Sequence, residues 1–160
     1  MNIEIAYLKD YPQFIEELSL HLHNEFSIYN PGGSLEKRKL RLLRYMQKKS
    51  IPETFIVLIN GHLAGTASLI DYDMDTYKYL TPWLASVYTL PEFRRKGVAS
   101  ALVWRVLREA DDLGVNRIYL FTEKLVHFYE RFGWKRMFDT EYKGRTVSVM
   151  CNELIQNKIY

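Results

Sequence analysis

The sequence has little of several features that would by themselves indicate a class of protein. Its single cysteine, Cys151, excludes an internal disulfide framework and any cysteine-based metal site. No segment is both apolar enough and long enough to cross a bilayer. The first nine residues also lack the basic-then-apolar order of a signal peptide. We therefore predict a cytoplasmic protein with no metal site and no membrane partner.

The net charge is also small, because 22 Lys and Arg side chains against 19 Asp and Glu side chains leave only +3. Such a balance allows an anionic ligand but does not indicate a nucleic-acid-binding protein. The chain has 160 residues, 48% of them hydrophobic, and it contains no internal repeat or low-complexity tract. These values predict one globular domain spanning residues 1–160.

The first part of the chain predicts a strand followed by two helices. Residues 2–8 alternate between apolar and polar side chains, which is typical of a strand. Asp10 is then the expected N-cap of a helix, with Gln13 at the N3 position of a capping box. The run Asn30-Pro31-Gly32-Gly33 ends that helix, and Ser34 is the expected N-cap of the next one.

The second predicted helix has an apolar face and a basic face. The basic face has charged side chains at i, i+4, i+7 and i+11, namely Lys37, Arg41, Arg44 and Lys48. Such a stripe can contact nucleic acid or an acidic ligand, but most charged stripes of this kind are solvated. We interpret this one as a solvated helix face.

The remainder of the chain predicts strands interrupted by two further helices. Strands are expected over 54–59, 63–70, 83–90, 117–122, 135–142 and 145–150, and helices over 98–113 and 123–132. Asn60-Gly61 marks a hairpin turn, and Gly114 and Gly133 are the expected helix ends. One strand–helix–strand unit among antiparallel pairs predicts an α/β fold whose central sheet is mixed, mostly antiparallel and flanked by helices.

A basic turn between the predicted strand 83–90 and the helix after it is the segment most suggestive of chemistry. It reads Arg94-Arg95-Lys96-Gly97-Val98-Ala99. The first turn of a helix presents free N–H groups and the positive end of the helix dipole, and Gly97 adds no Cβ to block a ligand. These features suit a pyrophosphate, although a solvated turn is an equally common reading of one such motif. The spacing matches neither a P-loop nor the dinucleotide-binding fingerprint.

Two motifs in this sequence resemble those of one known family. Residues 94–99 are similar to the Q/R-x-x-G-x-G/A signature of the GNAT superfamily, the acetyl-CoA-dependent N-acetyltransferases. Residues 127–134, His-Phe-Tyr-Glu-Arg-Phe-Gly-Trp, resemble that family's F-Y-x-x-x-G-F/W segment. The separation of the motifs and the order of elements also match. The resemblance implies one N-acetyltransferase domain over residues 1–160, with acetyl-CoA as cosubstrate in a slot between two splayed strands.

The resemblance also implies roles for particular residues. The pyrophosphate would be wrapped by the main-chain N–H groups of Arg94, Arg95, Lys96, Gly97, Val98, Ala99 and Ser100. The pantetheine amides would pair with the strand residues Val87, Tyr88 and Thr89. Phe128 would pack near the cofactor arm, and Tyr129 would donate a hydrogen bond or a proton to the departing thiolate.

The sequence departs from the family pattern at two positions. Thr122 stands where an asparagine often contacts the cofactor, seven residues before the tyrosine. Trp83 stands where histone-type members carry a glutamate general base. No base is therefore assigned, and the carboxylates expected near element ends are candidates: Glu25, Glu53, Asp71 and Asp73.

The acceptor is inferred from the segment between the strands 63–70 and 83–90. Residues 71–79 place carboxylates beside aromatic rings, which suits a small cationic amine of the polyamine, amino-acid-derived or aminoglycoside type. A solvated loop explains the same composition. The alternatives are a protein N-terminal or lysine acetyltransferase, a catalytically silent acyl-CoA sensor and, less well supported by the charge balance, a nucleic-acid-binding module. We expect a small-molecule partner and no nucleic acid, and a homodimer is left open.

Overall fold

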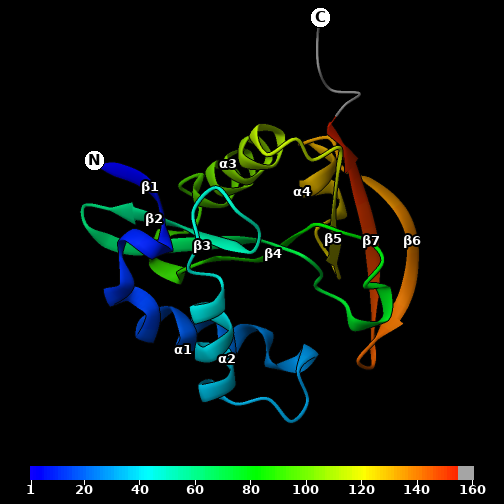
Figure 1. The fold of residues 1–160 in the computed structure, drawn as a ribbon, viewed down its shortest axis with the longest axis horizontal. Helices are drawn as coiled ribbons and strands as arrows, with labels where there is room; N and C mark the ends of the chain where they lie inside the picture. Colours follow the sequence, from blue (N-terminus) through cyan, green and yellow to red (C-terminus); the bar gives the residue numbers. More distant parts are fainter. Residues whose placement is uncertain (155–160) are drawn as a thin grey trace, which may run out of the picture.

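A seven-stranded sheet separates two helical layers in the computed structural model, which describes residues 1–154 (Figure 1). The strand order is β1-β2-β3-β4-β5-β7-β6, and only the β4–β5 pair is parallel. The mixed, mostly antiparallel sheet predicted from the sequence is therefore confirmed. The strands are β1 (Ile3–Tyr7), β2 (Glu53–Ile59), β3 (His62–Ile70), β4 (Trp83–Thr89), β5 (Arg117–Thr122), β6 (Lys135–Tyr142) and β7 (Arg145–Glu153).

The helices cover opposite faces of the sheet. The first pair, α1 (Ile15–Phe26) and α2 (Leu35–Arg44), lies on one face, and α3 (Val98–Asp112) and α4 (Val126–Glu130) lie on the other (Figure 1). Because successive side chains of a strand point to opposite faces, β2 contributes to both cores. Phe55 and Val57 pack with α3, whereas Ile56 and Leu58 pack with α1 and α2.

The start of the first helix differs from the prediction. Asp10 does not cap it, because the chain forms two 3-10 turns, Leu8–Asp10 and Pro12–Phe14, before α1 begins at Ile15. Pro12 disfavours a helical conformation at the residue before it, and that residue, Tyr11, has φ −136° and ψ 58°. A continuous helix from Asp10 is therefore excluded.

Other predicted boundaries agree with the structure more closely. Ser34 caps α2, where its hydroxyl accepts a hydrogen bond of 3.1 Å from the backbone N–H of Lys37. Gly114 adopts φ +78° directly after the C-cap of α3, as a helix-terminating glycine does. The predicted helix 123–132 is shorter than expected, and the final strand extends to Glu153.

The strands β4 and β5 separate shortly after they meet. Their register contains a single pair, Trp83 with Tyr119, so the carboxyl-terminal half of β4 has no partner on this side. On its other side β4 has an irregular register with β3, and Ser86 there adopts φ 55°. A β-bulge bends and twists a strand away from its neighbour. The splayed strand pair expected from the family resemblance is therefore present.

Candidate active site

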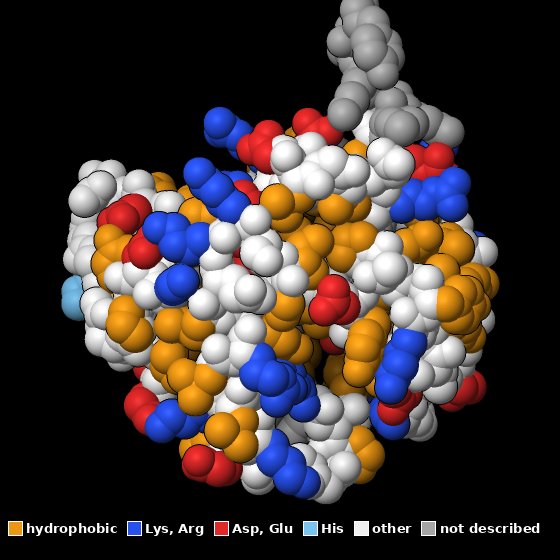
Figure 2. Space-filling model, in the orientation of Figure 1, with side chains coloured by type: hydrophobic (Ala, Val, Ile, Leu, Met, Phe, Trp, Pro, Cys, Tyr) orange, Lys and Arg blue, Asp and Glu red, His pale blue; other side chains and the backbone are white. Residues whose placement is uncertain are grey.

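A cavity of about 1220 Å³ occupies the gap between β4 and β5. Its walls come from both strands, including Ser86 and Val87 of β4 and Phe121 and Thr122 of β5. It is also lined by α1 and α2 from one face of the sheet and by Tyr129 of α4 from the other. On the molecular face drawn in Figure 2, basic and acidic side chains surround a hollow near the centre. The cavity thus connects the two helical layers through the sheet.

The strand that lines this cavity leads directly into the basic turn. Residues 94–97 are exposed, and Arg95 and Gly97 adopt left-handed φ values of 63° and 79°. The first helical hydrogen bond of α3 runs from Ala101 N to Gly97 O at 3.0 Å. The N–H groups of Val98 to Ser100 therefore have no acceptor within the helix. A Cβ placed on Gly97 would meet no atom within 4 Å, so the turn is open to a ligand.

One arginine of this turn is held against the strand before it. Arg94 Nε donates a hydrogen bond of 3.1 Å to the carbonyl oxygen of Thr89, and its guanidinium lies 5.8 Å from the Tyr88 ring centroid. Arg95 and Lys96 extend the positive charge at the exposed turn. The partial positive charge at the N-terminus of α3 and the full positive charges of these side chains lie together at this turn, which suits a phosphate group.

Tyr129 is buried at the α4 end of the cavity. It is 7% exposed, and its ring packs against Phe128 and Trp134 at centroid separations of 5.1 and 5.8 Å. Burial raises the pKa of Tyr129, with no hydrogen bond or neighbouring charge opposing it. The hydroxyl therefore stays protonated at neutral pH and can act as a donor towards the cavity.

The residues next to Tyr129 have structural contacts of their own. Thr122 Oγ1 accepts a hydrogen bond of 3.1 Å from the backbone N–H of Leu125, so this hydroxyl supports the start of α4. Phe128 stacks edge-on against Tyr129 and Phe132 and packs on the α3 side of the sheet. Thr122 lines the cavity as well as supporting α4. Phe128, in contrast, is not among the lining residues.

Three of the four candidate carboxylates lie at the cavity, namely Glu25, Asp71 and Asp73. The fourth, Glu53, does not line it, and its candidacy as the base is wrong. Glu53 is the first residue of β2 and is fully buried. Its side chain lies beside Glu109 of α3.

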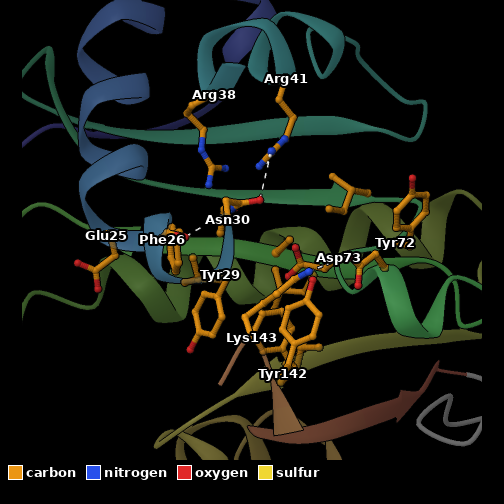
Figure 3. A pocket seen from close by; sticks show the side chains of 18 of the residues that line it. Glu25, Phe26, Tyr29, Asn30, Arg38, Arg41, Tyr72, Asp73, Tyr142 and Lys143 are labelled. Carbon is orange, nitrogen blue, oxygen red and sulfur yellow. Dashed lines mark hydrogen bonds and ion pairs between the residues drawn. The ribbon is translucent and has the colours of Figure 1, made fainter. Parts of the chain in front are cut away.

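The environment of Asp73 at the cavity favours its protonated form. Burial raises its pKa to about 6, against the opposing charges of Arg38 and Arg41. A carboxyl group that titrates near neutral pH can both accept and release a proton under working conditions. Figure 3 shows Asp73 near the centre of the cavity wall, with the two arginines extending from α2 towards it.

The basic stripe of α2 is largely solvated, as interpreted from the sequence, with Lys37, Arg44 and Lys48 exposed and Arg41 half-buried. Lys37, Arg41 and Arg44 line the cavity, and only Lys48 lies beyond the helix, where it pairs with Asp10. Arg38, which the basic stripe does not include, lines the same wall and is 7% exposed. Its spacing of four residues from the buried Leu42 was the available signal.

Other polar groups at the cavity are already paired. Glu123 accepts hydrogen bonds from the Tyr29 hydroxyl and, at 2.7 Å, from Arg145 Nε. Asp75 pairs with Lys143 at 3.0 Å. Within residues 1–154, no cluster of three or more His, Cys, Asp or Glu is placed to hold a metal ion. The same residues contain no helix long and apolar enough to span a membrane.

Solved structures of the same fold include several acetyltransferases. An aminoglycoside 6′-N-acetyltransferase complexed with coenzyme A has a TM-score of 0.74 and 16% identity, covering 96% of this chain and 97% of that one. The Vibrio cholerae spermidine N-acetyltransferase with CoA and spermine has a TM-score of 0.70 and 20% identity, covering 96% of each chain. A Salmonella typhimurium protein described as an acetyltransferase, with its cofactor acetyl-CoA, has a TM-score of 0.71 and 19% identity, covering 95% and 94%. At these identities the likeness establishes the fold alone.

The sheet order and the gap between β4 and β5 thus define an α/β protein of the acetyltransferase fold. The model of the acetyltransferase (GNAT) family matches residues 17–134 of the sequence. The chain belongs to this family, which confirms the resemblance carried by residues 94–99 and 127–134. No match is found among curated proteins.

Proposed function

We propose that this protein transfers the acetyl group of acetyl-CoA to the primary amine of a small molecule by direct attack on the thioester. The observation that carries the proposal is the cavity between the parted strands. It joins the α4 side of the sheet, where Tyr129 lies, to the α1–α2 side, where Asp73 and the arginines lie. Two reactants entering from opposite faces would meet within the sheet, which supplies the orientation that a two-substrate reaction needs.

The residues at the donor end fit coenzyme A. The open turn at Gly97 and the free N–H groups from Val98 to Ser100 suit the pyrophosphate. The unpaired edge of β4 from Val87 to Thr89 suits the pantetheine amides, and a backbone N–H there is our proposed donor to the thioester oxygen. The solved structures of this fold that contain CoA or acetyl-CoA support this assignment.

Tyr129 is the proposed donor to the leaving thiolate. A thiol has a reference pKa of about 8.5 and tyrosine one of about 10, so full proton transfer is uphill even before burial is considered. Burial raises the pKa of Tyr129 further. Hydrogen-bond donation, with transfer only as the thiolate develops, is therefore the favoured role.

The acceptor amine must lose a proton, and we propose that Asp73 assists. An alkylamine of pKa about 10.4 is neutral in only about one molecule in 2,500 at pH 7. Asp73 lines the cavity, and its pKa of about 6 lets it take the proton directly or through one water molecule. Neighbours of this fold include enzymes named for spermidine and aminoglycosides, which supports a small amine as the acceptor class.

A silent acyl-CoA sensor is the rival, because the buried Trp83 occupies the position of the glutamate base of histone-type members. Thiol release from acetyl-CoA against a panel of small amines, peptides and proteins separates the two. Release with a small amine supports the transferase. Stabilisation by acetyl-CoA without release from any amine, peptide or protein would identify a sensor instead.

The cofactor site has its own test at Gly97. Gly97→Glu places bulk and a like charge where the pyrophosphate would bind, and we expect acetyl-CoA affinity to fall by about 100-fold or more. Gly97→Ala is the matched control, since it meets no atom and carries only the backbone cost of its φ of +79°. Calorimetry with equal affinities for the Glu variant and the unmodified protein would overturn the assignment.

A further inference from the structure

The α2 wall of the cavity holds positive charge that no carboxylate neutralises directly. Arg38 is 7% exposed, and burial, together with the charge of Arg41, lowers its pKa to about 10. Among the ion pairs of residues 1–154, none includes Arg38 or Arg41. Arg41 reaches only the neutral Asn30 Oδ1, at 3.4 Å. Buried charges are normally paired, so an unpaired guanidinium facing a cavity indicates a ligand of opposite charge.

The acidic groups of the cavity do not fill this role. Asp75 and Glu123 are bound to Lys143 and Arg145. Asp73 faces both α2 arginines but lies beyond ion-pair distance, and its pKa stays raised despite them. Figure 3 shows Arg38 and Arg41 extending in parallel from α2 into the cavity, with Asp73 across from them. Glu25 and Asp71 also line the cavity, but within residues 1–154 neither forms an ion pair with Arg38 or Arg41. The α2 wall therefore presents Arg38 and Arg41 to a ligand, with Asp73 opposite them.

We propose that the acceptor is a zwitterion, a small amine that also carries an anionic group such as a carboxylate or a phosphonate. Arg38 and Arg41 would bind the anionic group, and Asp73 would face the amine. This inference rests on the proposed function and selects the amino-acid-derived class over polyamines and aminoglycosides. A polyamine would place further ammonium groups beside two unpaired arginines, and like charges at close range repel. Arginine's planar fork, in contrast, matches carboxylate and phosphonate oxygens in pairs.

The substrate preference is tested with matched amines. Each amino acid is compared with its amide, and 4-aminobutanoate with 1,4-diaminobutane, in the thiol-release assay. We expect kcat/KM to be about 10-fold to 100-fold higher for the partner that carries the anion. The amide has the less basic amine, so a preference for the acid cannot come from amine ionisation. Equal or better turnover of amides and diamines would overturn the inference while leaving the transferase function intact.

The arginines are tested by removing their charge. Arg41→Gln and Arg38→Gln should raise KM for the preferred acid by about 10-fold to 100-fold and leave KM for its amide unchanged. Arg41 is the more exposed of the two, so it keeps the test valid if the buried Arg38 variant does not fold. The matched control is Arg108→Gln, because Arg108 is exposed on α3 and does not line the cavity. KM values that change equally for acid and amide would contradict the assignment.

A binding experiment separates this inference from the proposed function. Calorimetry measures the affinity of the same amino acids and amides for the protein in the presence of CoA, without turnover. If no amine is acetylated but acids bind through Arg41, the transferase function fails and the anion site stands. If amines are acetylated and neither acid preference nor an effect of Arg41→Gln is found, the anion site fails and the function stands.

Discussion

At the scale of single residues, the most informative group is the tyrosine whose role came from a short motif. A tyrosine on a helix that packs against a sheet is ordinarily part of the core, and Tyr129 is indeed buried against Phe128 and Trp134. It nevertheless lines the cavity, and its hydroxyl has no competing charge nearby. One residue therefore combines packing with the proposed donor role.

Removal of this hydroxyl gives a residue-scale prediction. Tyr129→Phe keeps the ring packing and should lower kcat by about 100-fold, within the range for a positioned proton donor, with acetyl-CoA affinity nearly unchanged. Tyr79→Phe is the control, since Tyr79 is 76% exposed and does not line the cavity. Steady-state kinetics and calorimetry measure the two quantities. An unchanged kcat would remove Tyr129 from the mechanism.

Residues were predictable where a local pattern determines their environment. Ser34 was identified as a helix cap from its position before a helical repeat. Gly97 was identified as the glycine of the turn where the next helix begins, from the motif around it. Arg38 and Tyr29 were missed because their places at the cavity depend on the packing of α1 and α2 across the sheet. No spacing in the sequence contains that information beyond the helical period.

At the scale of elements, the strand β4 determines where the cavity forms. Its irregular register with β3 and its single pair with β5 both occur within seven residues, Trp83–Thr89. Elements were predictable where periodicity and turn residues agree, as in the hairpin at Asn60-Gly61. The predicted start of the first helix was wrong, because Pro12 keeps the backbone of Tyr11 out of the helical conformation that a cap at Asp10 would require.

The irregular residue of β4 gives an element-scale prediction. Ser86 has φ 55°, a conformation that costs a β-branched residue about 2 kcal/mol and that glycine adopts freely. Ser86→Val should lower the free energy of unfolding by about that amount and, by favouring a regular strand, weaken acetyl-CoA binding about tenfold. Ser86→Gly is the matched control and should retain the affinity. Denaturant unfolding and calorimetry provide the measurements, and equal affinities for both variants would contradict a role for the bulge.

At the scale of the whole molecule, a buried polar cluster joins the first strands to the longest helix. Tyr7 of β1 donates to both carboxylate oxygens of Glu109 on α3, at 3.0 and 3.1 Å, and Arg105 pairs with Glu109 at 3.2 Å. Glu53 of β2 lies beside Glu109, and its Oε1 has no hydrogen-bond partner among the described residues. The cluster contains two carboxyl groups, Glu53 and Glu109, but only one cation, Arg105, so the folded state favours a protonated, neutral Glu53.

This arrangement makes the stability of the fold depend on pH. Burial and the adjacent Glu109 raise the pKa of Glu53 from 4.5 to about 8, so the folded state binds its proton more tightly than the unfolded state. The corresponding stability is fully present below pH 4.5 and is lost as pH rises through about 8. The pKa of Glu109 is lowered, because the adjacent Glu53, the hydrogen bonds from Tyr7 and the charge of Arg105 outweigh its burial, so its own contribution to stability declines only as pH falls. Above neutral pH, the titration of Glu53 therefore dominates the pH dependence of stability.

Replacement of this one carboxyl group tests the argument for the whole fold. Glu53→Gln places a neutral side chain beside Glu109 and removes the titration, so its Tm should vary less between pH 6 and 9 than that of the unmodified protein. At pH 9 the variant should be more stable by roughly 2–4 kcal/mol, which corresponds to about 5–15 °C in Tm for a chain of this size. Glu92→Gln, at an exposed position, is the control and should follow the unmodified protein at every pH. Thermal unfolding measured across this range decides the matter, and parallel curves for both variants would show that Glu53 is already ionised in the folded state.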